Sequence, residues 1–165
     1  MGCQKVCHFK KVIFIFVLCE ILSSCASTKD ITNDNILRGS YRKGIVLISK
    51  QEILLNKHNY LWAHKPDIEK VKKYGLSEDY KGMLEKGTKI EILRIELFQH
   101  PENGNYVYPI GQILTGKWKG EEVNLYYVSA SSNNPANDSY YVDIKDIDTK
   151  IFEIVNEENS YRNAQ

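Results

Sequence analysis

Short apolar runs separated by polar turns dominate the chain from residue 41 onward. Val123 to Ser129 is apolar on both alternating faces, which predicts a central strand that is buried on both sides. Other short runs, rich in branched and aromatic residues, predict further strands. They are Gly44–Ile48, Gln51–Leu55, Tyr60–Trp62, Tyr106–Thr115 and Tyr140–Ile144. We therefore expect one mainly β domain of the α+β class over residues 41–155.

The longest β pattern covers Thr88–Phe98 and changes phase part-way along. Ile90 and Ile92 fall on one alternating face, whereas the apolar residues from Leu93 onward fall on the other. An extra residue in one strand of a pair shifts the phase in this way and bends the strand. The sequence therefore predicts a small antiparallel β-barrel or a strongly bent sheet.

Two segments carry a helical pattern. Residues 66–74 begin with Pro66, which suits the first turn of a helix, and are followed by Gly75, which can end one. Acids near the start of this segment and lysines near its end also match the helix dipole. We expect a short helix here, and one or two short helices in the domain as a whole. Residues 146–155 fit either a second helix or a last strand, and both remain open.

The N-terminus has the layout of an export signal. Three lysines and no acid occur in the first 11 residues, Val12–Cys19 is an unbroken apolar run, and small residues follow. Basic, apolar and then small is the order of a secretory signal peptide. The apolar run is far shorter than the roughly 20 residues that span a bilayer. We therefore expect a cleaved signal rather than a permanent transmembrane helix.

The run Leu22-Ser23-Ser24-Cys25 resembles the lipobox of bacterial lipoproteins, in which an aliphatic and two small residues precede an invariant cysteine. The resemblance implies that the Cys25 thiol carries a diacylglycerol and that signal peptidase II cuts before it. It also implies a membrane anchor made of acyl chains. By the sorting rule of that family, Ala26 favours the outer membrane, with the domain facing the periplasm. Glu20 departs from the family pattern.

These features divide the chain into four parts. We expect a signal peptide over 1–24, a lipidated cysteine with a flexible polar tether over 25–40, the domain over 41–155 and a polar tail over 156–165. All cysteines lie at or before the proposed cut, so the mature chain is expected to have no disulfide and no free thiol. They are Cys3, Cys7, Cys19 and Cys25. The alternative is that Cys19 and Cys25 are buried thiols of a cytosolic helix.

Charge gives no sign of a nucleic-acid partner. The whole chain carries 22 basic and 21 acidic residues. Without the three lysines and one glutamate that precede Cys25, 19 basic and 20 acidic residues remain, a net charge of −1. A nucleic-acid-binding domain normally shows a strongly basic face. We therefore expect no nucleic acid among the partners.

The sequence has no catalytic or cofactor signature. It contains no Gly-x-Ser-x-Gly elbow and no phosphate-binding glycine loop. His58, His64 and His100 are scattered and form no pair at the spacing of metal ligands. The acidic cluster of residues 143–148 lacks the alternating acids and the glycine of a calcium loop. We therefore expect no enzymatic activity, no cofactor and no metal.

The span Gly87–Val155 resembles bacterial Src-homology-3-like barrels. The matching parts are its Gly-Thr-Lys-Ile-Glu-Ile opening, its glycine-bounded turns and its Tyr-Val-Asp-Ile-Lys-Asp-Ile close. Such barrels often bind peptides or cell-wall polymers, so the resemblance implies a binding domain. It assigns no individual binding residue.

Aromatic side chains are the candidate binding groups. Trp118 lies between two lysines in a predicted turn, where a core residue is least expected. Tyrosines on neighbouring strands could line one groove, where they offer stacking faces and hydroxyl donors. The candidates are Trp118, Tyr106, Tyr108, Tyr126, Tyr127 and Tyr140. The alternative is that half of them belong to the core and the rest have no role.

The sequence therefore predicts a lipid-anchored envelope protein that binds another molecule without doing chemistry. Its expected partners are the membrane, through Cys25, and an envelope protein or a cell-wall polymer. Two other functions remain open. One is an inhibitor or immunity protein against a secreted enzyme that attacks the envelope. The other is a structural subunit of an envelope assembly.

Overall fold

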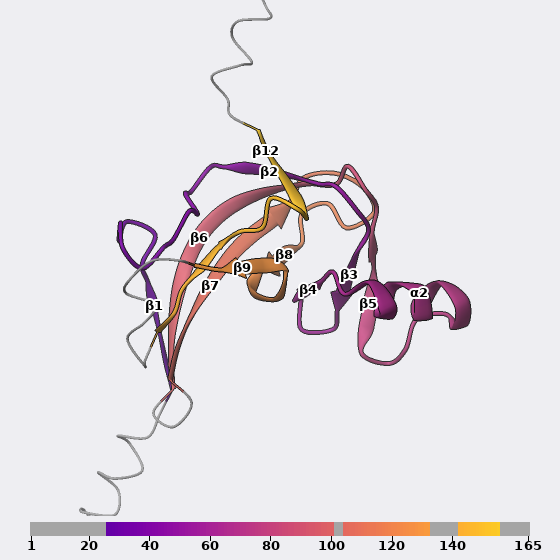
Figure 1. Ribbon diagram of the computed structural model, residues 1–165, viewed down its shortest axis with the longest axis horizontal. Coiled ribbons are helices and arrows are strands. Elements are labelled where there is room, and N and C mark those ends of the chain that lie inside the picture. The colour runs from indigo at the N-terminus through magenta and orange to yellow at the C-terminus, as the bar shows by residue number, and fades with distance from the viewer. Residues whose placement is uncertain (1–25, 101–103, 133–141, 156–165) are drawn as a thin grey trace, which may run out of the picture.

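A computed structural model describes residues 26–100, 104–132 and 142–155. These residues form antiparallel sheets with one short α-helix, which confirms the expected mainly β class (Figure 1). The strands are β1 (Ser27–Asp30), β2 (Val46–Ser49), β3 (Ile53–Asn56), β4 (Leu61–Trp62), β5 (Tyr80–Leu84), β6 (Lys89–His100), β7 (Gly104–Ile113), β8 (Glu122–Asn124), β9 (Ser129–Ser131), β10 (Val142–Asp143), β11 (Lys145–Ile147) and β12 (Phe152–Val155). The helices are α2 (Lys65–Tyr74) and the 3-10 helix η1 (Tyr126–Val128). The expected signal peptide, Cys25 and the polar tail lie outside the described residues.

The largest sheet has seven strands and is built on the long hairpin of β6 and β7. Its order is β10-β7-β6-β2-β12, with β1 also paired to β6 and β8 to β7. The pairs are antiparallel except β10 with β7, which is parallel. β10 and β12 end the path, so the described strands form an open sheet. Of the two architectures that we expected, the closed barrel is therefore not formed by the described strands.

The phase change in the β6 sequence is a bulge, as predicted. The register of β6 with β7 shifts between Ile92 and Arg94, which leaves Leu93 without an opposite residue. Ile92 and Ile95 are both fully buried, one on each side of the shift. Figure 1 shows β6 and β7 curving together along their length. An extra residue thus keeps the apolar side chains on the core face while the strand bends.

The core lies on one face of this curved hairpin. Leu97 of β6 lies opposite Val107 of β7, and both side chains are buried. Tyr41 and Phe152 are the largest side chains with no exposed area, and they pack in the same cluster. Burial of this apolar area supplies the main driving force for folding.

A second sheet carries the helix. β3 pairs with β4 and β5 in antiparallel register, and α2 follows β4. The helix has Pro66 in its first turn and ends before Gly75, as predicted, and it buries Ile68. β5 was not among the expected strands. Leu84 is buried, but the central Gly82 has no side chain and Lys81 is charged, so the apolar pattern of a strand is weak there.

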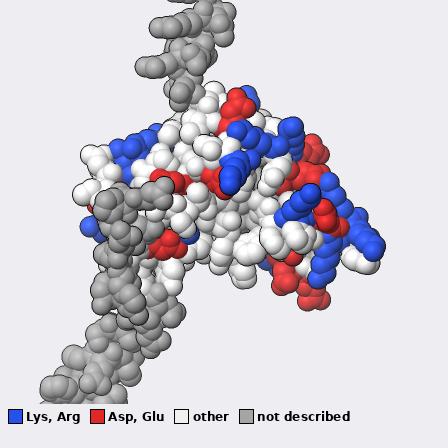
Figure 2. Space-filling view, viewed as in Figure 1, with Lys and Arg blue, Asp and Glu red and all other residues white. Residues whose placement is uncertain are grey.

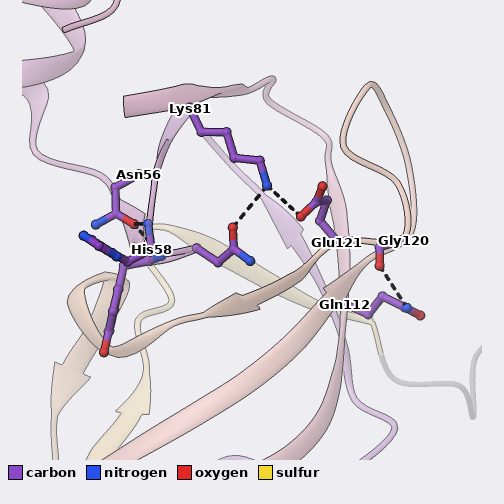
Figure 3. Close-up of polar contacts among 8 residues, drawn as sticks. Asn56, His58, Lys81, Gln112, Gly120 and Glu121 are labelled. Carbon is purple, nitrogen blue, oxygen red and sulfur yellow. Dashed lines mark hydrogen bonds and ion pairs between the residues drawn. The ribbon is translucent and has the colours of Figure 1, made fainter. Parts of the chain in front are cut away.

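Lys81 of β5 connects the two sheets. Its Nζ donates to Glu121 Oε2 at 2.7 Å and to Asn59 Oδ1 at 3.2 Å (Figure 3). Glu121 directly precedes β8 of the large sheet, and Gln112 of β7 donates to the Gly120 carbonyl in the same turn. These contacts fix the turn that carries Trp118.

The central strand expected over Val123–Ser129 is wrong. β8 ends at Asn124, the chain turns through η1, and β9 begins at Ser129. The Asn124 side chain accepts a hydrogen bond from the Tyr126 N–H, and the Ser129 hydroxyl donates to the Leu125 carbonyl. These bonds stabilise a turn inside an apolar sequence. The segment is apolar at both alternating sets of positions because the chain changes direction within it. It is not a strand with both faces buried in the core.

Part of the expected tether belongs to the fold. β1 pairs with the end of β6, and Ile31 is only 4 % exposed. Asp34 Oδ1 then accepts hydrogen bonds from two backbone N–H groups of a turn. The polar composition of this segment thus comes from an exposed edge strand and a turn. For residues 146–155, the sequence fits either a second helix or a last strand. The structure has a strand there, β12.

Candidate binding surface

Seven aromatic side chains contact one another in a continuous group, which we call the aromatic surface. Neighbouring ring centroids lie between 4.8 Å and 6.4 Å apart, and several pairs meet edge to face. Edge-to-face contact is the arrangement that ring quadrupoles favour. The members are Tyr60, Trp62, Phe98, Tyr106, Tyr108, Tyr126 and Tyr127.

The β6–β7 hairpin supplies three of these rings. Phe98 and Tyr106 each stack on Tyr108, with centroids 5.7 Å and 6.4 Å apart. Side chains alternate along a strand, so these residues share the face opposite to the buried Leu97 and Val107. The hairpin therefore packs the core with one face and carries the aromatic surface on the other.

The 3-10 turn η1 supplies two further rings. Tyr126 meets Tyr106 and Tyr108 edge-on, at interplanar angles of 79° and 84°. Tyr127 contacts Tyr60 and Trp62 and is 51 % exposed. The turn thus joins the hairpin rings to those of the second sheet, and it leaves Tyr127 as the most exposed member.

A polar group of three side chains positions Tyr126. Its hydroxyl donates to Asp143 Oδ2, which also accepts from Lys145 Nζ at 3.0 Å. The Lys145 ammonium lies 4.4 Å from the centroid of the Tyr126 ring, and its side chain is 11 % exposed. Burial raises the pKa of Tyr126, and the neighbouring Asp143 raises it further. The ring is therefore a neutral hydrogen-bond donor at physiological pH.

An Asp143→Ala variant is expected to lose about 2 kcal/mol of unfolding free energy. The Lys145 side chain, which is 11 % exposed, would lose its carboxylate partner; such a loss costs about 3–5 kcal/mol at a fully buried site and less here. Urea unfolding followed by circular dichroism measures the loss. The double variant Asp143→Ala, Lys145→Met should recover much of it. A single variant as stable as the wild type would contradict the role given to this pair.

A second carboxylate holds the indole of Trp62. Asp67 Oδ2 accepts from Trp62 Nε1 at 2.7 Å and lies 2.8 Å from His64 Nδ1. The hydrogen bond from Trp62, and then that of His64, lower the pKa of Asp67. Because Asp67 lies in the first turn of α2, the helix fixes the edge of the aromatic surface.

Four of the six candidate binding residues lie in the aromatic surface. They are Tyr106, Tyr108, Tyr126 and Tyr127. Tyr140 and the lipidation candidate Cys25 lie outside the described residues. Trp118 lies apart from the surface: its ring covers Gly82, with Lys117 Nζ and Lys81 Nζ at 4.9 Å and 5.5 Å from the ring centroid. Its half-buried indole packs between β5 and a turn.

Three members of the surface, Tyr60, Trp62 and Phe98, are not among the residues predicted from the sequence. Alternation from the buried Leu97 places Phe98 on the outer face of β6, so its position could have been predicted. Trp62 belongs to β4 of the second sheet, and Tyr60 directly precedes that strand. An isolated β-bridge pairs Tyr60 with Asn124, next to η1, and brings its ring to the aromatic surface. No local sequence pattern predicts that pairing.

The described residues hold no group of three or more His, Cys, Asp or Glu side chains that could bind a metal ion. The acids of the 143–148 cluster serve the fold instead. Asp146 Oδ1 accepts from the Ser40 N–H at 2.6 Å, and Asp148 Oδ1 accepts from the Lys150 N–H at 2.8 Å. Figure 2 shows lysines and acids interleaved over α2, at the right of the view.

Comparison with protein families, curated proteins and solved structures found no match. Among the described residues, no helix has the length and apolar character needed to cross a membrane.

Proposed function

We propose that this chain is a lipid-anchored protein of the cell envelope, held at Cys25 in the outer membrane and facing the periplasm. Its β domain binds a cell-wall polysaccharide through the aromatic surface and does no chemistry on it. The proposal combines the lipobox resemblance of Leu22–Cys25 with one structural observation. That observation is the continuous group of rings on the outer face of the β6–β7 hairpin, with Tyr127 51 % exposed.

The chemistry of the surface favours a sugar polymer. A sugar ring has apolar C–H faces and an edge of hydroxyl groups, and tyrosine offers both a stacking face and a hydroxyl. Carboxylates stand at two margins of the surface, where Asp67 and Asp143 can accept hydrogen bonds from sugar hydroxyls. Apolar rings with a few placed polar groups are the usual composition of a binding site.

A Tyr127→Ala variant tests the proposal. It is expected to weaken binding at least tenfold, because exposed aromatic anchors carry about 2 kcal/mol or more at a binding surface and about 1.4 kcal/mol is tenfold in affinity. The measurement is co-sedimentation of the purified protein with insoluble wall polysaccharide. Tyr74→Ala is the matched control, since Tyr74 is 72 % exposed on α2 and lies outside the aromatic surface.

Two results would overturn this reading. In the first, the wild-type protein does not sediment with the polymer but co-purifies with one envelope protein, which makes the partner a protein. In the second, both variants sediment like the wild type, which would mean that the aromatic surface is not the binding site.

A further inference from the structure

β1 is attached to the hairpin at both of its ends. Its register pairs Ser27 with Gln99 and Asp30 with Glu96, and the Ser27 hydroxyl donates to the Gln99 side chain at 3.4 Å. Just past β1, the Ile31 N–H donates to the Ile95 carbonyl at 2.9 Å, and the Ile31 side chain is buried. The segment is therefore part of the sheet and cannot swing as a linker would.

The direction of β1 decides where the chain before it leaves the domain. β1 is antiparallel to β6, so its first residue lies at the end of β6, one pair from the His100–Gly104 pair. Figure 1 shows β1 along the lower end of the hairpin, with β2 and β12 at the upper end. Cys25 precedes Ser27 by two residues, which allows at most about 7 Å between their Cα atoms.

We infer that the β1–β6 pairing holds the domain in one orientation on the bilayer, with the end of β6 that pairs with β1 nearer to the lipid headgroups than the start of β6. The inference rests on the lipid anchor at Cys25 proposed above. The turn before β6 lies at the other end of a 12-residue strand, up to roughly 40 Å away.

Two fluorescent probes measure this orientation. The mature chain has no cysteine after Cys25, so Gln99→Cys and Lys86→Cys each give one labelling site. Both positions are exposed, and they lie at opposite ends of the hairpin. Each lipidated protein is placed in vesicles of phosphatidylethanolamine and phosphatidylglycerol that carry a nitroxide quencher on some headgroups. The probe at position 99 should be quenched several-fold more than the probe at position 86.

A lengthened chain is the control. About ten glycine and serine residues inserted between Ala26 and Ser27 add a reach of roughly 17 Å, which frees the domain from the anchor. This insertion should remove most of the difference between the probes while the protein still floats with the vesicles. Equal quenching at both positions in the original chain would overturn the orientation and leave the lipid anchor in place. A protein that does not float, with an unmodified Cys25 by mass spectrometry, would overturn both.

Discussion

A Gly82→Ala variant is expected to lose about 2–3 kcal/mol of unfolding free energy, although it adds only one methyl group. A Cβ atom at this position would lie 2.1 Å from Trp118 Cζ2 and 2.7 Å from Cε2. The indole cannot simply withdraw, because hydrogen bonds hold its turn: the Glu121 N–H donates to the Trp118 carbonyl and the Gly120 N–H to the Ile113 carbonyl. Forced overpacking of this kind typically costs about 1–3 kcal/mol.

The cause is tested by removing the indole. Trp118→Ala alone should also destabilise the fold, by about 2–3 kcal/mol, since the ring is partly buried against the core. In the Trp118→Ala background the added methyl group should cost almost nothing, so the two losses should not add. Gly116→Ala is the control, because no atom lies within 4 Å and only its φ of +81° opposes a side chain. Strictly additive losses from Gly82→Ala and Trp118→Ala would refute the contact.

Alkaline pH is expected to unfold the protein through Tyr41. Its ring has no exposed area, and its hydroxyl lies 2.6 Å from Ser129 Oγ. The Ser129 proton is already donated to the Leu125 carbonyl, so the Tyr41 hydroxyl donates to Ser129. Burial raises the pKa of Tyr41 above its ordinary value of 10, and the nearby Asp146 and Asp148 raise it further.

The sign of the pH effect follows from that shift. Below pH 10 Tyr41 is neutral in both the folded and the unfolded chain, and its stabilisation is fully present. Above pH 10 the unfolded chain ionises first, so the free energy of unfolding falls by about 1.4 kcal/mol per pH unit from this residue alone. Burial likewise raises the pKa of Tyr108 and Tyr126, which adds to the loss in the same direction.

A Tyr41→Phe variant separates this effect from other titrations. At pH 8 it should be less stable than the wild type by about 1 kcal/mol, the usual worth of a lost hydrogen bond. Because it lacks the ionising group, it should become the more stable protein about one pH unit above 10. Urea unfolding of both proteins between pH 8 and pH 11.5 locates the crossing. Parallel stability curves across that range would contradict the burial argument.

The elements that local sequence determines were predicted well. The bulge of β6 is visible as a phase change because one extra residue must move every later apolar side chain to the other parity. The helix α2 is visible because Pro66 and Gly75 set its ends by their own backbone preferences. Neither prediction needed to know what the element packs against.

The features that depend on distant contacts were not predictable in the same way. η1 lies inside an apolar run, and only the Asn124 and Ser129 side chains signal its turn. A side chain packed against the core is least expected in a turn, but Gly82 on β5 leaves a space that the half-buried Trp118 indole fills. Three of the seven members of the aromatic surface follow from strand alternation, whereas Tyr60 and Trp62 join it only because the second sheet packs there.

The position of β2 in the large sheet has a consequence for how the chain folds. β2 lies between β6 and β12 in the sheet. It therefore pairs with one strand some forty residues later in the chain and with another that begins at residue 152. Pairings of such long sequence separation slow folding, because the intervening chain must be closed into a loop first. A chain that is synthesised from its N-terminus therefore cannot complete this sheet until the residues of β12 have been added.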